Sequence, residues 1–319
     1  MSGPRTRWSL WAAIVAAVVI AGVLVTWSVT TAASKRDGSP PPVTTGETST
    51  APPTVASLAD SPEPSARSAP PPAVAPVSPK ALVAAAEGAA PDGMTLGVAV
   101  LDVNTGELVA GSDGERQFMA ASLTKLILAV DILDQHRAEG RPLDADDLDL
   151  VGRALSSSDD NAMNALWGRH DGAGGVGRVA DRLGLTASLP SGSAEMWGDA
   201  EVTAADMAGV YRHVLRDMAP EDAAVIVGAL SAANPVATDG FAQHYGLLHQ
   251  GASPRHYAKQ AWVEYAPAGY LLHSVGVAYD TRTGHAYAVA LLSIQPYTSG
   301  QEARDRLSSV AAAAMAVIT

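Results

Sequence analysis

The feature that most constrains this fold is the order of periodic segments within residues 80–319. Apolar runs with the pattern of strands occur only near the two ends of this region, at 95–102, 108–111, 257–265, 270–279 and 285–294. Elsewhere, apolar residues recur at steps of three and four, which predicts helices over 80–87, 122–135, 146–155, 161–169, 174–183, 203–218, 220–232 and 301–318. This order predicts an α+β fold whose five-stranded antiparallel sheet is built from both chain ends and flanked by helices.

The first 33 residues have the pattern of a membrane segment. Arg5 and Arg7 precede an apolar run at 8–29, and about 20 apolar residues span a bilayer as a helix. Because this run is longer than the usual apolar core of a signal peptide, we expect a single-pass anchor with the folded part outside the cytoplasm. The small residues at 31–33 leave a cleaved signal peptide, and hence secretion, as the alternative.

Residues 34–79 have the composition of a linker. The stretch 39–79 holds 12 of the chain's 21 prolines, and most of its other residues are Ser, Thr, Ala and Val. Such a segment cannot bury enough apolar surface to offset the entropy lost on ordering, so we expect a disordered tether. Residues 80–319 then form one folded domain, which we expect to be monomeric.

Composition excludes several classes of function. The net charge is −12 and the basic residues are scattered, so no face offers the positive field that nucleic acid requires. The chain has no cysteine, which excludes disulfides, thiolate metal sites, a cysteine nucleophile and a lipid-modified cysteine. The eight histidines show no metal-ligand spacing, so the sequence implies no metal and no cofactor.

Ser122 and Lys125 form the only Ser-x-x-Lys sequence in the chain, at the start of a strongly apolar predicted helix. Positions three apart share a helix face, so the lysine amine can reach the serine hydroxyl. Burial and the helix N-terminus both favour a neutral lysine, which could accept the serine proton and activate the hydroxyl as a nucleophile. The alternative is that Ser122 only caps the helix.

A second polar cluster occupies residues 156–164, between two predicted helices. It contains Ser158, Asp160, Asn161 and Asn164, whose hydroxyl, carboxylate and carboxamide groups could face a cleft. The alternative is a helix cap, because Ser, Asp and Asn are the residues that cap best.

Together these motifs resemble those of the penicillin-recognising serine hydrolases, the superfamily of class A β-lactamases and D-alanyl-D-alanine peptidases. The resemblance covers residues 80–319, including the order of strands and helices. It implies that Ser122 is the nucleophile, that Lys125 is its base and that Ser158 relays a proton.

The same resemblance implies substrate-binding roles within the second cluster. The family carries Ser-x-Asn there, whereas this chain has Asp160 in the asparagine position and Asn161 one place later. Asn164 falls where the family often has a further asparagine. The interval from Ser122 to Ser158 is shorter than in class A enzymes, which implies a reduced helical subdomain.

The family's third motif, Lys-Thr-Gly on a strand, has two candidates here. Lys259-Gln260-Ala261-Trp262 lies on the first of the three C-terminal strands, where the family places the motif that binds the substrate carboxylate. We favour this candidate, which assigns substrate binding to Lys259, Gln260 and Trp262, with the Trp262 amide in the oxyanion hole. His273-Ser274, on the next strand, is the alternative and otherwise lies near the cleft.

The loop after Leu185 departs from class A enzymes, which place a deacylating glutamate there. In this chain the position of that glutamate falls near Ala187, and the acidic residues nearby are Glu195, Asp199 and Glu201. An acyl-enzyme without a base to activate water would persist. The resemblance therefore implies an extracytoplasmic serine acyl-enzyme hydrolase with weak turnover, acting on β-lactams or on D-Ala amide bonds of cell-wall peptides. The alternative is a catalytically degenerate member that binds peptidoglycan or a protein partner.

Overall fold

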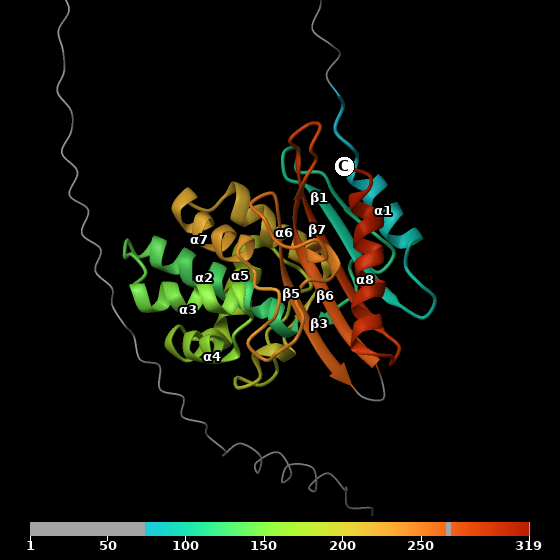
Figure 1. The fold of residues 1–319 in the computed structure, drawn as a ribbon. Coiled ribbons are helices and arrows are strands. Elements are labelled where there is room, and N and C mark those ends of the chain that lie inside the picture. Colours follow the sequence, from blue (N-terminus) through green and yellow to red (C-terminus); the bar gives the residue numbers. More distant parts are fainter. Residues whose placement is uncertain (1–73, 266–268, 319) are drawn as a thin grey trace, which may run out of the picture. The chain divides into compact units, whose positions relative to one another are not determined.

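The computed structural model describes residues 74–265 and 269–318 (Figure 1). The predicted membrane segment and residues 34–73 of the predicted linker lie outside the described residues, so the division into anchor, linker and domain stays a prediction. None of the described helices combines the length and the hydropathy that crossing a bilayer requires.

The main sheet has five antiparallel strands and is assembled from both ends of the folded region, as predicted. Its order is β2-β1-β7-β6-β5, formed by β1 (Thr95–Asp102), β2 (Leu108–Ala110), β5 (His256–Tyr265), β6 (Gly269–Tyr279) and β7 (Ala286–Gln295). The N-terminal hairpin joins the C-terminal strands through β1 and β7, which pair along their whole length from Thr95 opposite Ile294 to Asp102 opposite Tyr287. This order leaves β5 as an edge strand, with one side free to border a cleft.

Helices cover both faces of the sheet (Figure 1). One face packs against α1 (Pro79–Gly88) and α8 (Gly300–Met315), while α6 (Ala204–Arg216) packs on the other. The remaining helices form a block beside α6, made of α2 (Thr124–Ala138), α3 (Ala145–Ser156), α4 (Asp160–Arg169), α5 (Gly172–Leu183) and α7 (Pro220–Ser231). The predicted α+β class is confirmed, and the predicted helices are present with ends that differ by up to three residues.

The strand sequences explain the two-faced sheet. Between its end residues Thr95 and Asp102, strand β1 has no polar side chain, because side chains alternate between faces and both faces of the sheet are buried. Ala99 and Leu101 belong to the core beneath the helical block, whereas Val98 and Val100 belong to the core beneath α1 and α8.

A second, two-stranded sheet was not predicted from the sequence. It pairs β3 (Phe118–Met119) with β4 (Glu201–Val202), and each strand is too short to show a period. The helix predicted to begin at Ser122 begins at Thr124, after the 3-10 turn η1 (Ala121–Leu123). The small sheet therefore fixes the approach of the chain to Ser122.

Tyr211 fastens α6 to the edge of the main sheet. Its buried hydroxyl donates to the carbonyl of Val275 at 2.8 Å and accepts from the backbone amide of Lys259 at 3.3 Å. Burial raises the pKa of the hydroxyl far above its usual value, so the group stays neutral and can serve both partners. One side chain thus joins α6 to the strand that carries Lys259.

We predict that Tyr211→Phe lowers the free energy of unfolding by about 1–3 kcal/mol, because two buried backbone groups lose a partner. Urea denaturation followed by circular dichroism measures the change. The control is Tyr297→Phe, since the Tyr297 side chain is exposed and its hydroxyl donates to the exposed Glu264 at 3.3 Å. This control should change stability by less than about 0.5 kcal/mol. Equal stability of both variants would contradict the role given to Tyr211.

Candidate active site

A cavity of about 350 Å³ lies between η1, the edge strand β5 and a second 3-10 turn, η2 (Trp197–Asp199). It is lined by Met119, Ala121, Ser122, Asp160, Trp197, Gly198, Asp199, Asp239, Trp262, Val263 and Tyr265. Of the residues assigned to catalysis or binding from the sequence, Ser122, Asp160 and Trp262 are therefore part of its wall.

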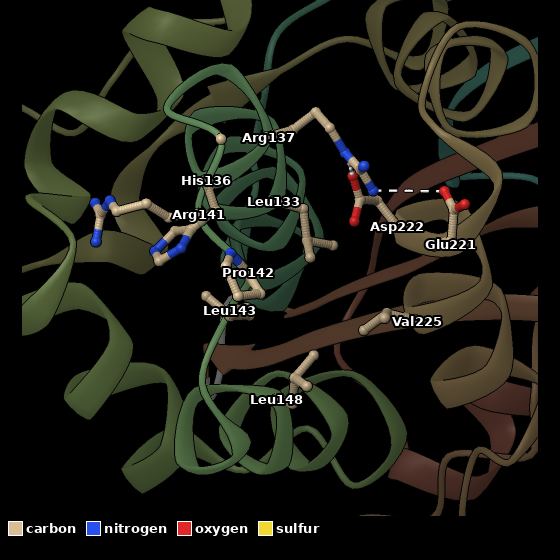
Figure 2. Close-up of a pocket in the computed structure, with 11 residues that line it drawn as sticks. Leu133, His136, Arg137, Arg141, Pro142, Leu143, Leu148, Glu221, Asp222 and Val225 are labelled. Carbon is tan, nitrogen blue, oxygen red and sulfur yellow. Dashed lines mark hydrogen bonds and ion pairs between the residues drawn. The ribbon is translucent and has the colours of Figure 1, made fainter.

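A larger cavity of about 480 Å³ lies within the helical block (Figure 2). None of the residues assigned to catalysis or binding from the sequence is among its lining residues. Leu133, Leu148 and Val225 contribute to its walls, and at its rim Arg137 pairs with Asp222 and Glu221. None of its lining residues carries a hydroxyl or a lysine amine. The smaller cavity is the candidate active site.

Local backbone geometry presents Ser122 to the cavity. Ala121 has a φ of 46°, in the left-handed region that a residue with a Cβ seldom occupies. The amide of Ala120 donates to the carbonyl of Ala200 at 2.6 Å, which joins this segment to the start of β4. A strained residue held by its surroundings is common at functional sites, and here it immediately precedes the candidate nucleophile.

Lys125 lies beneath Ser122 and is 1% exposed. Its Nζ is 2.7 Å from the Ser122 Oγ, 3.3 Å from the Ser158 Oγ and 2.6 Å from the Asp160 Oδ1. Burial lowers the pKa of Lys125, while the nearby Asp160 carboxylate opposes that shift. The amine is thus within hydrogen-bonding distance of the serine hydroxyl, and the carboxylates of Asp160, Asp239 and Asp159 raise its pKa against the effect of burial.

Ser158 lies in the turn between α3 and α4 and is also held in the left-handed region, with a φ of 51°. The next residue, Asp159, caps α4 by accepting from the amides of Asn161 and Ala162. Asp159 also pairs with Arg153 of α3. These contacts fix the turn, so the Ser158 hydroxyl points inward although its neighbours serve as a cap.

Lys259 approaches the same hydroxyl from β5. Its Nζ lies 2.9 Å from the Ser158 Oγ and 2.8 Å from the carbonyl oxygen of Gln260, and its side chain is fully buried. Burial and, after it, the charge of Lys125 lower the pKa of Lys259. The Ser158 hydroxyl therefore lies between two lysine amines, in a chain that runs from Ser122 through Lys125 and Ser158 to Lys259.

Three residues assigned from the sequence lie away from the cavity wall. Gln260 is buried against the chain before η3 (Gly246–Leu248), where its Nε2 donates to the carbonyls of Gln243 and Tyr245. Ser274 is also buried and accepts from the amide of Leu247. Asn161 is exposed on the first turn of α4 and is not among the lining residues. These three residues are therefore not part of the cavity wall, and the substrate-binding roles given to Gln260 and Asn161 stay predictions.

His273 and Asn164 support the walls of the cavity. The buried ring of His273 has its Nε2 2.9 Å from the carbonyl oxygen of Met119, and burial lowers its pKa to about 4. Asn164 accepts a hydrogen bond at 2.9 Å from the indole nitrogen of Trp197. Trp197 in turn places its ring 4.5 Å from the Lys125 Nζ.

Asp239 and Tyr265 are among the lining residues that were not predicted from the sequence, and the positions of both depend on tertiary contacts. Asp239 lies in the loop between α7 and β5, where its Oδ2 accepts from the indole nitrogen of Trp262 at 3.0 Å. Tyr265 ends β5 and has its hydroxyl 3.2 Å from the sulfur of Met119. Neither residue belongs to a motif. Of the three acids considered as a replacement base, only Asp199 lines the cavity.

The chain is similar to curated proteins from mycobacteria. It is 34% identical over 217 residues to the proteins named "Putative lipoprotein LppW" in Mycobacterium tuberculosis and Mycobacterium bovis, which covers 66% of this chain and 67% of each relative. No protein-family model matches the chain.

Solved structures share the fold at low sequence identity. A β-lactamase from Sphaerobacter thermophilus is 20% identical with a TM-score of 0.56, over 76% of this chain and 98% of that one. A class A β-lactamase from Bacteroides cellulosilyticus is 14% identical with a TM-score of 0.60, over 75% and 97%. PBP-A, solved as an acyl-enzyme with penicillin G, is 15% identical with a TM-score of 0.55, over 73% and 94%. This chain therefore belongs to the family of the mycobacterial LppW proteins and has the fold of the penicillin-recognising serine hydrolases.

Proposed function

We propose that this protein is a serine acyl-enzyme hydrolase with Ser122 as its nucleophile. The observation that carries the proposal is the 2.7 Å distance between the Ser122 Oγ and the buried amine of Lys125. Neutral Lys125 accepts the hydroxyl proton while the Oγ forms a bond to the acyl carbon of the substrate. The backbone amides of Ser122 and Trp262 stabilise the resulting oxyanion.

The contacts of Ser158 support the second half of acylation. When the bond from the acyl carbon to the leaving group breaks, Ser158 donates its proton to that group. The ammonium of Lys125, 3.3 Å away, then returns a proton to Ser158 and becomes neutral again. Lys259, which also contacts Ser158, supports the orientation of this hydroxyl.

We propose β-lactams or D-alanyl peptide amides of the cell wall as substrates, with slow release of the acyl group. No glutamate lines the cavity within the described part of the chain, so water lacks the base that class A enzymes are expected to use. Asp199 is the acid among the lining residues that could assist from the neighbouring turn.

A second candidate function is binding of peptidoglycan or a protein partner without turnover. The ion pair between Lys125 and Asp160, at 2.6 Å, favours this alternative because it stabilises the ammonium form, which cannot accept the serine proton. The two candidates differ in whether Ser122 becomes acylated.

Intact-mass spectrometry after incubation with a fluorescent penicillin and with an uncharged activated ester distinguishes them. We expect one acyl adduct per wild-type chain and none on Ser122→Ala, because the nucleophile is absent. Ser309→Ala, which alters an exposed serine of α8, should be acylated like the wild type. An adduct that persists on Ser122→Ala would overturn the assignment of the nucleophile, and no adduct on the wild type would favour the binding function.

The pH dependence of acylation tests the opposing effects on Lys125. The base form is the neutral amine, so acylation should slow as the pH falls through the pKa of Lys125. Asp160 raises that pKa against the effect of burial. We therefore predict that Asp160→Asn moves the rising part of the pH–rate profile to lower pH and accelerates acylation several-fold on its acidic side. Asp305→Asn, on α8, is the control and should leave the profile unchanged; the same result for Asp160→Asn would contradict the prediction.

We also propose that residues 8–29 anchor the protein in the membrane, with residues 80–319 outside the cytoplasm. The relatives are named lipoproteins, whereas this chain has no cysteine that could carry a lipid. Its apolar N-terminal run would supply the attachment instead.

Cell fractionation tests this location. We expect the full chain to remain in the membrane pellet after a carbonate wash, and a variant lacking residues 2–33 to become soluble. A chain found in the medium whose N-terminus lies near residue 33 would instead establish a cleaved signal peptide.

A further inference from the structure

The cavity around Ser122 is bordered by negative charge. Three of its lining residues, Asp160, Asp199 and Asp239, have exposed carboxylates, and none of the lining residues is Lys, Arg or His. They come from three separate parts of the chain, namely the start of α4, the turn η2 and the loop before β5. A substrate that reaches Ser122 must therefore pass or contact these carboxylates.

Of the two nearby lysines, Lys125 pairs with Asp160, and neither lysine forms an ion pair with Asp199 or Asp239 within the described part of the chain. The amine of Lys125 is hydrogen-bonded to Ser122, Ser158 and Asp160. The amine of Lys259 is hydrogen-bonded to Ser158 and to the carbonyl of Gln260. Both are buried, and burial lowers the pKa of both, which favours their neutral forms. The substrate carboxylate that the family resemblance assigns to Lys259 would thus have no exposed cation to meet.

Aromatic rings line the same cavity. Trp197, Trp262 and Tyr265 belong to its wall, and the Lys125 Nζ already lies 4.5 Å from the Trp197 ring centroid. Aromatic faces attract ammonium and guanidinium groups, and nearby carboxylates strengthen that attraction where water is partly excluded. Rings and carboxylates therefore favour the same kind of ligand.

The acidic positions are fixed by the fold. Asp239 accepts from the Trp262 indole at 3.0 Å and from the amide of Phe241 at 2.9 Å. The backbone amide of Asp199 donates to the carbonyl of Met196 within the η2 turn. Burial and the charge of Asp199 raise the pKa of Tyr265, which indicates that this carboxylate acts on the cavity.

We propose that, among the β-lactams and D-alanyl peptide amides proposed above, the site is selective for acyl donors that carry an ammonium or guanidinium group in addition to their carboxylate, and disfavours those whose only charge is negative. This inference rests on the proposed acylation of Ser122 and specifies its substrate class. A peptide or ester with a free amine near the scissile carbonyl has the required chemistry. Asp199 and Asp239 are the residues that determine this preference, with Asp160 contributing while it also positions Lys125.

Three p-nitrophenyl esters of equal length test the inference on the full chain in detergent. Their acyl groups end in trimethylammonium, in the uncharged isostere tert-butyl, or in carboxylate. We expect Ser122 to be acylated about tenfold faster by the cationic than by the anionic ester, with the uncharged ester between them. The ratio should decrease as salt is added, because ions screen exposed carboxylates.

Variants locate the source of the preference. Asp199→Asn and Asp239→Asn should each lower the cation-to-anion ratio by about two- to threefold, and the asparagine at 239 can still accept from Trp262. Asp305→Asn, an equal charge change on α8, is the matched control and should retain the wild-type ratio. Urea midpoints check that each variant is folded.

The outcomes separate the two levels of the proposal. Equal acylation by all three esters, or a ratio unchanged in both active-site variants, overturns the charge preference and leaves the Ser122 mechanism intact. Failure of every ester to acylate Ser122 overturns the proposed function and, with it, the substrate class.

Discussion

The site depends on the burial of two lysine amines against a single hydroxyl. Lys125 and Lys259 approach the Ser158 Oγ at 3.3 and 2.9 Å, and both side chains are almost completely removed from solvent. Two buried ammonium groups this close would repel each other and lose their hydration, so the arrangement favours at least one neutral amine. A neutral amine beside a serine is the chemical requirement for a base that activates the hydroxyl.

This arrangement requires three parts of the fold to hold their positions. Lys125 comes from α2, Ser158 from the turn between α3 and α4, and Lys259 from the edge strand β5. The hydroxyl of Tyr211 joins α6 to β5 and β6. The left-handed backbone conformations of Ala121 and Ser158 set the path of the chain at Ser122 and at Ser158. The strain at those residues persists because packing and capping contacts over-determine the surrounding backbone.

Two residues depart from the family pattern, Asp160 in the cavity wall and Gln260 in the core, whereas Ser122, Lys125, Ser158 and Lys259 retain the expected residue types. Asp160 occupies the position of a neutral amide in the family motif and pairs with Lys125, and Gln260 turns away from the cleft into the core. Under the proposed mechanism, the carboxylate of Asp160 affects the pH at which Lys125 is neutral. Both departures leave the fold unchanged, because a carboxylate at an exposed helix start and an amide bonded to buried carbonyls are both satisfied where they lie.

The sequence alone determined the sheet, the helices and the pairing of Ser122 with Lys125, because these follow from periodicity and from short intervals along one helix. The sequence also shows Ser158 and Lys259 in the order in which the family motifs occur along the chain, but it does not show that their side chains are in contact. Their meeting, across 101 residues, depends on the packing of the helical block against β5. The small β3–β4 sheet, the turn of Gln260 into the core, and the approach of Asp239 and Tyr265 were likewise decided by tertiary structure. Each depends on contacts between segments distant in sequence, and such contacts leave no local pattern.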